Sequence, residues 1–389
     1  MKILILTSRF GMGHYCAAEA IKEELRGENS KDSIEVVDII QALFPRIYKI
    51  IYGFFNLFIC RFSGIYNCIN SYATNQENPF IKEIILNKIN YIINKYKPDL
   101  IISTWSASSR FISSYKAVYG EKIPLYTYVT DVTVHNGWIT EGTDMYFVAA
   151  KSTKDMLISE GVPSNKIVIN GIPVRKGFKE SNNPKKYINK KNILIMGGGL
   201  GLIPEINNIL DELSEKDIFI TVITGKNKKL NNWLKTAYPQ LKVVGYTNEV
   251  HKYMREADLI ITKPGGLSTF EAIYSNTPLC IIKPFLSQEI GNAKFIETMG
   301  IGKVLWKNET KMAEDIIELI NDKALLVKMK YNMELIRSEI GQSKLKDIYE
   351  RNIKYVDYDY SSCSSSIYND LWGNSYNSIQ TAEYKVKKA

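Results

Sequence analysis

Short apolar runs alternate with helical patterns along most of the chain, and this alternation constrains the fold more than any other feature. It is typical of a parallel α/β sheet. The first run, Lys2–Ser8, leads into a glycine-rich turn and a helix expected from about His14 to Arg26, and the pattern restarts at Ile193–Met196. We therefore predict an α/β protein with two successive Rossmann-like halves. The other predicted strands are Ile34–Ile39, Leu100–Thr104, Leu125–Thr130, Met145–Ala149, Lys166–Ile169, Ile218–Thr224, Lys242–Val244, Leu259–Thr262 and Leu279–Ile282.

The chain length also favours two domains, because 389 residues are many for one hydrophobic core. A polar stretch rich in Asn and Lys interrupts the pattern at residues 181–192, and we expect it to be the linker between domains 1–180 and 193–355. Residues 356–389 are rich in Ser, Tyr and Asn, so we expect a loosely ordered tail.

Composition argues against several classes of function. The formal net charge of +9 suits an anionic partner, but no nucleic-acid motif or basic cluster is present, so we expect no nucleic acid. The five cysteines are scattered without a C-x-x-C pair, which favours reduced cytoplasmic thiols and no metal site. No apolar run reaches the roughly 20 residues that span a bilayer, so we expect a soluble or peripheral protein.

Three glycine turns follow predicted strands: Gly11–His14, Gly197–Gly201 and Pro264–Ser268. At such a turn the backbone N–H groups of a helix N-terminus are free, and glycine lets a phosphate approach them. The third turn opens a helix that carries Glu271. A carboxylate at that position can accept both hydroxyls of a ribose, or it can simply favour the positive end of the helix dipole.

Five ordered segments carry a resemblance to a known family. They read GMGHYCAA at Gly11–Ala18, TDVTVHNGW at Thr130–Trp138, NGIPVRKGF at Asn170–Phe178, KPGGLSTFEA at Lys263–Ala272 and QEIGNA at Gln288–Ala293. Over residues 1 to about 306 the chain resembles the monogalactosyldiacylglycerol synthases and processive diacylglycerol glucosyltransferases of glycosyltransferase family 28.

This resemblance implies a GT-B fold and an inverting transfer of a hexose from a UDP-sugar to diacylglycerol or a glycosyldiacylglycerol. It implies no cofactor and no essential metal. Glucose is favoured over galactose, because bacterial members mostly use UDP-glucose and the composition rich in Lys, Ile and Asn suggests a bacterial source. The alternatives are a polyprenyl-linked or cell-wall acceptor, and a non-catalytic membrane protein that binds a nucleotide-sugar.

The resemblance also assigns roles to residues. The turn at Pro264–Ser268 would face the diphosphate and Glu271 the ribose, while the loop at Tyr246–Val250 would hold uracil. Gly13, His135 and Trp138 would border the acceptor, and the loop Trp105–Ser109 departs there from the family's usual His/Pro pattern. The predicted donor-binding residues are Gly198, Gly199, Leu200, Tyr246, Val250, Pro264, Gly265, Gly266, Ser268, Glu271, Gln288, Glu289 and Asn292.

Two residues are candidates for the catalytic base. His14 starts the first helix, where the dipole disfavours a second positive charge and keeps the imidazole neutral. We expect the rate to fall as the pH drops through its pKa, nominally about 6.5. Asp131 is the competing base, or the partner that orients His14.

An amphipathic segment lies in the first half. No acidic residue occurs from Ile39 to Gln76, and apolar residues recur there at helical spacing beside Arg46 and Lys49. Such a helix suits the surface of an anionic membrane, here the inner face of the cell membrane, although a helix packed on its own domain shows a similar pattern. The predicted membrane-contact residues are Ile47, Ile51, Phe54, Phe55, Phe58 and Phe62.

Overall fold

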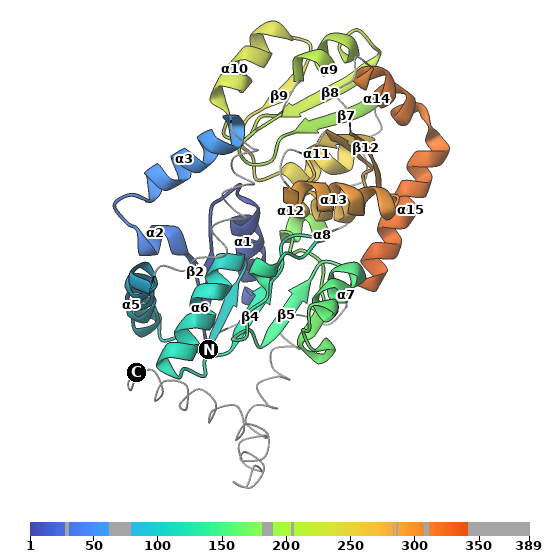
Figure 1. The fold of residues 1–389 in the computed structure, drawn as a ribbon. Helices are drawn as coiled ribbons and strands as arrows, with labels where there is room; N and C mark the ends of the chain where they lie inside the picture. Colours follow the sequence, from blue (N-terminus) through green and yellow to red (C-terminus); the bar gives the residue numbers. More distant parts are fainter. Residues whose placement is uncertain are drawn as a thin grey trace, which may run out of the picture. The chain divides into compact units, whose positions relative to one another are not determined.

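The computed structural model describes residues 1–27, 31–61, 79–180, 190–203, 206–282, 284, 287–306 and 311–340. For residues 56–61, 79–82, 287 and 288 it describes the backbone alone. Residues 1–341 form one compact unit, which contains two parallel sheets with helices packed on them (Figure 1). The predicted linker and tail fall largely outside the described residues, so the domain boundaries stay a prediction.

The first sheet has six parallel strands in the order β2-β1-β3-β4-β5-β6. Residues 3–7 of β1 are all buried, because helices cover both faces of the sheet. The strand order reverses between β1 and β3. The strands are β1 (Lys2–Thr7), β2 (Ser33–Asp38), β3 (Leu100–Ser103), β4 (Leu125–Tyr128), β5 (Met145–Val148) and β6 (Ile167–Ile169). The helices are α1 (Gly13–Arg26), α2 (Ile39–Leu43), α3 (Tyr48–Arg61), α5 (Pro79–Tyr96), α6 (Ser106–Tyr119), α7 (Lys151–Ser159) and α8 (Lys176–Lys179), with short 3-10 turns η1 (Asn136–Trp138) and η2 (Ser164–Lys166).

The second sheet is also six-stranded and parallel, in the order β12-β11-β10-β7-β8-β9. Its strand order reverses between β7 and β10. The strands are β7 (Lys191–Met196), β8 (Ile218–Ile223), β9 (Lys242–Val244), β10 (Leu259–Thr262), β11 (Leu279–Ile282) and β12 (Gly302–Leu305). The helices are α9 (Ile206–Leu213), α10 (Lys228–Ala237), α11 (Val250–Glu256), α12 (Gly266–Ser275), α13 (Ser287–Thr298), α14 (Met312–Asn321) and α15 (Lys323–Glu339).

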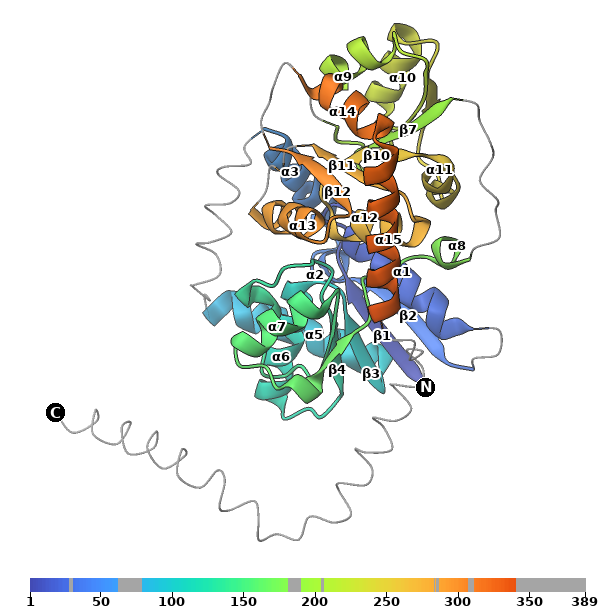
Figure 2. The ribbon, with the colours of Figure 1, turned by 90° about the vertical axis from the view of Figure 1, so that its right-hand side faces the viewer.

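One apolar core joins the two halves. Ile172 and Phe178, which follow β6, belong to the same buried cluster as Phe270 of α12 and Met333 of α15. Figure 2 shows α15 running past α12 toward the first half, and the Ile340 side chain just beyond it approaches Gly171. The halves are therefore held against each other by buried apolar side chains.

The predicted strands agree with the structure, apart from their ends and one omission. Strand β7 begins at Lys191 rather than Ile193, because the buried Asn192 finds polar partners: its amide groups donate to Asp258 Oδ2 and to the Glu256 carbonyl, each at 2.9 Å. Strand β12 was not predicted, since Lys303 interrupts its short apolar run. That lysine is partly exposed and pairs with Asp315 at 2.9 Å, outside the core.

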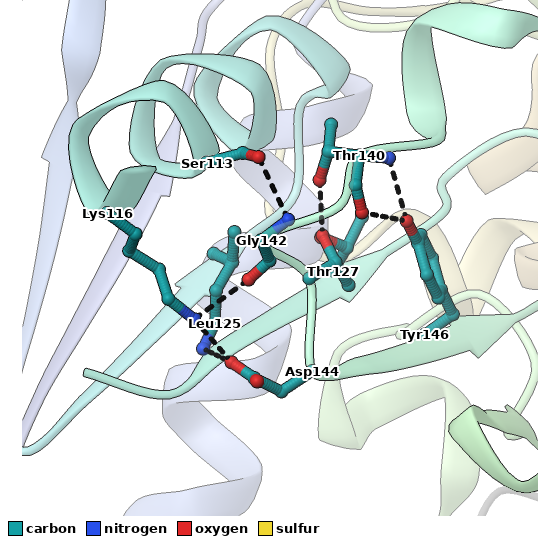
Figure 3. A network of polar contacts seen from close by, with 9 residues as sticks. Ser113, Lys116, Leu125, Thr127, Thr140, Gly142, Asp144 and Tyr146 are labelled. Atoms are coloured by element: carbon teal, nitrogen blue, oxygen red, sulfur yellow. Dashed lines mark hydrogen bonds and ion pairs between the residues drawn. The ribbon is translucent and has the colours of Figure 1, made fainter. Parts of the chain in front are cut away.

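A polar network fixes the loop between η1 and β5 (Figure 3). Lys116 of α6 donates to the Gly142 carbonyl at 2.8 Å and to Asp144 Oδ2 at 2.7 Å. The Tyr146 hydroxyl accepts a hydrogen bond from the Thr140 N–H at 2.9 Å and donates to its carbonyl at 3.0 Å. The segment that leads from β4 to this loop, residues 129–138, is thereby anchored at its far end.

Within the described ranges, no helix is both long enough and apolar enough to cross a membrane.

Candidate functional site

The two points where strand order reverses open into one pocket with a volume of about 500 Å³. In parallel sheets, ligands bind beyond the carboxyl ends of strands at such points. The pocket takes its lining from the turns after β1, β3, β7 and β10, and so from both halves of the chain.

Most predicted site residues meet in this pocket. Leu200 is half-buried and does not line it. Gln288 begins α13, but its side chain lies outside the described residues. The predicted residues that line the pocket are Gly13, His14, Asp131, His135, Trp138, Gly198, Gly199, Tyr246, Val250, Pro264, Gly265, Gly266, Ser268, Glu271, Glu289 and Asn292.

Gly266 at the N-terminus of α12 is required by a contact with the first half. A Cβ atom there would lie 2.3 Å from the Thr130 carbonyl oxygen, which no side chain tolerates. Met12 makes a related approach: it caps α1 in a left-handed conformation with φ 69°, and its side chain faces Gly199. Two of the glycines that suggested phosphate binding therefore also let the halves approach closely.

His14 is held by two threonines. Its Nδ1 atom lies 2.7 Å from Thr130 Oγ1, and the Thr104 hydroxyl donates to the His14 carbonyl at 3.0 Å. Desolvation lowers the pKa of the imidazole to about 4, opposed by a hydrogen bond to the Thr104 backbone and assisted by His135. His14 is therefore neutral at physiological pH, as a base must be.

Asp131 has other partners than His14, which the sequence analysis had considered for it. Among the described residues it makes no hydrogen bond or ion pair with His14. Its side chain is buried, which raises its pKa to about 6, while donors on Trp138 and Asn292 lower it. Thr130, one position earlier in the same motif, contacts the His14 ring instead.

Glu271 faces a cation from the other half of the molecule. Its Oε1 atom lies 4.0 Å from Nη2 of Arg175, which also donates to the Asn248 carbonyl at 3.1 Å. Burial raises the pKa of Glu271 to about 7, and Arg175 opposes that rise. Arg175 lies in the quoted segment NGIPVRKGF, but nothing in its spacing singled it out.

Two further predicted donor residues already have partners. Glu289 Oε1 lies 3.2 Å from the Lys263 ammonium group, so a lysine stands beside the third glycine turn. Asn292 is buried and bridges the halves: it donates to the Pro264 carbonyl at 3.0 Å and accepts from the Val132 N–H at 3.3 Å. These contacts indicate that Asn292 positions the turn.

The first half contributes an aromatic wall to the pocket. The Phe10 ring lies 4.8 Å from Tyr52, 4.4 Å from Phe55 and 5.4 Å from Trp105, measured between ring centroids. Phe10, Phe55 and Trp105 all line the pocket. The sequence had not indicated Phe10 as a site residue, whereas Trp105 begins the loop that the resemblance places on the acceptor side.

The predicted membrane-contact residues divide between two faces of α3 and of the turn just before it, which holds Ile47. Ile47 and Phe54 are exposed, together with Ile50, whereas Ile51 packs against the core of the first half and Phe55 lines the pocket. The backbone of Phe58 continues α3 without a described side chain, and Phe62 lies outside the described residues.

Solved structures share this architecture. The chain superposes on MurG of Acinetobacter baumannii with a TM-score of 0.56 and 15% identity, covering 91% of this chain and 100% of that one. The calicheamicin glycosyltransferase CalG4 gives a TM-score of 0.61 at 13% identity, with coverages of 92% and 99%. The S. aureus MnaA–UDP structure gives 0.57 at 16% identity, with coverages of 92% and 97%. The predicted GT-B fold is confirmed.

Sequence comparison is more specific. Residues 14–174 match the monogalactosyldiacylglycerol (MGDG) synthase family, and residues 192–351 match the glycosyltransferase family 28 C-terminal domain. A processive diacylglycerol beta-glucosyltransferase of Staphylococcus epidermidis is 31% identical over 363 residues, covering 89% of this chain and 90% of that protein. One from Bacillus pumilus is 30% identical over 375 residues, with coverages of 90% and 95%.

The two parallel sheets, with one pocket at their carboxyl ends, thus define a glycosyltransferase of the GT-B class. Within that class, the chain belongs to the family of MGDG synthases and processive diacylglycerol glucosyltransferases, as its motifs predict.

Proposed function

We propose that this protein transfers glucose from UDP-glucose to diacylglycerol, or to a glycosyldiacylglycerol, with inversion at the anomeric carbon. The proposal rests on one observation: a neutral histidine and two glycine turns of the second sheet line the same pocket. The relatives are named for diacylglycerol as acceptor and a glucosyl group as the transferred sugar. The UDP-bound neighbour MnaA agrees with a uridine nucleotide as the leaving group.

In the proposed reaction, His14 takes the proton of the acceptor hydroxyl as that oxygen attacks the anomeric carbon. The bond from that carbon to the UDP oxygen breaks on the opposite face. The N-terminus of α12 and the Lys263 ammonium group stabilise the negative charge that develops on UDP. This division of roles supports turnover without a bound metal ion.

The acceptor is a lipid, and we propose that α3 brings the protein to it. Ile47, Ile50 and Phe54 are 47%, 57% and 60% exposed at helical spacing, and Arg46 and Lys49 are exposed beside them. An apolar stripe flanked by cations suits the surface of an anionic bilayer. We place the enzyme peripherally on the inner face of the cell membrane.

The decisive experiment is a product analysis of the full chain. The protein is incubated with UDP-glucose or UDP-galactose and with either diacylglycerol in phosphatidylglycerol-containing liposomes or an undecaprenyl-linked acceptor. Both UDP release and glycolipids are measured. We expect glucosyldiacylglycerols and faster turnover with UDP-glucose. Turnover only on an undecaprenyl-linked acceptor would reject the proposed acceptor, and UDP-glucose binding without turnover on either would reject catalysis.

A further inference from the structure

The imidazole of His14 has two nitrogens, and only an unprotonated one can accept the acceptor's proton. Nδ1 is turned toward the buried Thr130 hydroxyl, 2.7 Å away. His14 also lines the pocket, so the opposite edge of the ring, which carries Nε2, is the one available to a ligand. Which nitrogen carries the proton therefore decides whether the base is usable.

The Thr104 carbonyl resolves this choice. It lies 3.5 Å from the Thr130 hydroxyl, which donates to it. A hydrogen bond with the Thr104 backbone also raises the pKa of His14, as expected when the ring donates and not when it accepts. A carbonyl oxygen can only accept hydrogen bonds. If the Thr130 proton points at Thr104, its oxygen is free to accept from Nδ1–H. Nδ1–H then donates to the Thr130 oxygen, and the Thr130 proton does not compete for Nδ1.

We infer that Thr130, acting with the Thr104 carbonyl, fixes His14 in the Nδ1–H tautomer and leaves Nε2 as the base. This role of Thr130 deepens the proposed function and rests on it. Many enzymes orient such a histidine with a carboxylate, and Asp131 was the candidate from the sequence. Here a hydroxyl and a carbonyl perform that task, and among the described residues no carboxylate is hydrogen-bonded to the ring.

This assignment accounts for every proton in the transfer. The acceptor O–H proton moves to Nε2 while the acceptor oxygen bonds to the anomeric carbon. The electron pair of the breaking bond leaves with UDP. The imidazolium ion then carries both protons, with Nδ1–H still held by Thr130, and releases the Nε2 proton to solvent. Thr130 never loses its own proton, so it is a positioning residue.

The test is nitrogen NMR of the full chain labelled with ¹⁵N in its histidine rings. The chain has three histidines, so His135→Gln and His251→Gln variants assign the His14 signals. At neutral pH we expect protonated Nδ1 and unprotonated Nε2 in the wild type, a mixture in Thr130→Val, and the wild-type pattern in Thr130→Ser. Protonated Nε2 in the wild type overturns the inference, as does an unchanged tautomer in Thr130→Val.

Turnover gives a second readout. Thr130→Val should lower kcat roughly three- to tenfold, the factor expected for one hydrogen bond between neutral groups, with KM for the UDP-sugar unchanged. Thr130→Ser should restore it, and Thr221→Val, at a buried threonine of β8, should match the wild type. A Thr130→Ser variant as slow as Thr130→Val overturns the role of the hydroxyl. If His14→Ala keeps full turnover, the proposed base is wrong, whereas the tautomer measurement stands independently.

Discussion

Arg175 and Glu271 come from different halves of the chain, and their charged groups lie 4.0 Å apart in the pocket. Burial holds the pKa of Glu271 at about 7 in spite of this cation. The carboxyl group assigned to the ribose therefore changes its charge within the physiological pH range.

The affinity for UDP should depend on this titration. The ionised carboxylate accepts two ribose hydroxyls, whereas the protonated form has fewer acceptor sites. Its folded-state pKa of about 7 means that the carboxylate dominates at pH 8 and the neutral acid at pH 6. We expect the Kd for UDP to be roughly tenfold weaker at pH 6, measured by calorimetry.

Glu271→Gln is the matched comparison, because the ligand's own phosphate also titrates near pH 6. The variant should bind UDP more weakly at pH 8 and follow only the ligand's pH dependence. Glu314→Gln, at an exposed residue of α14, should behave like the wild type. The same pH slope in wild type and Glu271→Gln would remove Glu271 from the ribose site.

His14→Ala should lower kcat by a factor of about 100 to 10,000, the usual contribution of a positioned base. Binding of UDP should persist, since the donor residues lie in the other half. The pH dependence differs from the sequence expectation: because the pKa of His14 is lowered to about 4, its protonation should not reduce the rate between pH 8 and 6. A rate–pH profile of kcat at saturating UDP-glucose measures this. A loss of rate toward low pH that disappears in His135→Gln would assign that titration to His135, whose pKa is lowered by burial.

Asp131→Asn separates the two candidate bases. The hydrogen-bond partners of Asp131 are Trp138 and Asn292, and not the His14 ring. We therefore expect a smaller loss of kcat, roughly tenfold, because the substitution disturbs packing at the junction of the halves. Single-turnover rates of Asp131→Asn and His14→Ala should be compared directly. Abolished turnover in Asp131→Asn beside an active His14→Ala would make Asp131 the base.

The exposed face of α3, together with Ile47 in the turn before it, can be tested without touching the pocket. Ile47→Ser, Ile50→Ser and Phe54→Ser combined should reduce pelleting with phosphatidylglycerol liposomes and spare UDP binding, because these side chains point to solvent. Raising the salt should also weaken pelleting, since the Debye length is about 10 Å at 0.1 M. Val327→Ser, at a 66% exposed residue of α15, is the control. Unchanged pelleting of the triple variant would exclude α3 as the membrane contact.

Removal of divalent metal with EDTA should leave the rate of glucosyl transfer within about twofold, because we propose that Lys263 and the α12 N-terminus stabilise the leaving UDP. Lys263→Met should lower kcat by roughly tenfold to a hundredfold. Abolished turnover in EDTA that Mg²⁺ restores would assign leaving-group stabilisation to a metal ion.

Strands and turns were predictable because they depend on local patterns. Alternation located β1 and β7, and each predicted strand ended within two residues of the observed one. Several predicted strands extended beyond their observed ends, as at Thr104 and Thr130. A small residue that tolerates an apolar environment continues the strand pattern, so the pattern did not mark where these strands end. Those two threonines leave the sheet and contact His14 instead.

The partners of the site residues were not predictable from spacing. Thr130 and His14 are 116 positions apart, and Arg175 and Glu271 are 96 apart in the numbering, so only the packed fold brings them together. The division of α3 into an outer and an inner face was also hidden, because Ile51 and Phe55 have the same apolar character as Ile47 and Phe54. Burial, not residue type, separates the two groups.

Helix α3 presents Phe54 to solvent and Phe55 to the pocket, while its Tyr52 hydroxyl accepts the Arg9 N–H at 3.0 Å in the turn before His14. On the proposed function, the same helix touches the bilayer and borders the reacting groups. The enzyme would then sample its acceptor by lateral diffusion within one leaflet. Its rate should follow the mole fraction of diacylglycerol in that leaflet, and inert lipid added at constant total diacylglycerol should slow it by surface dilution.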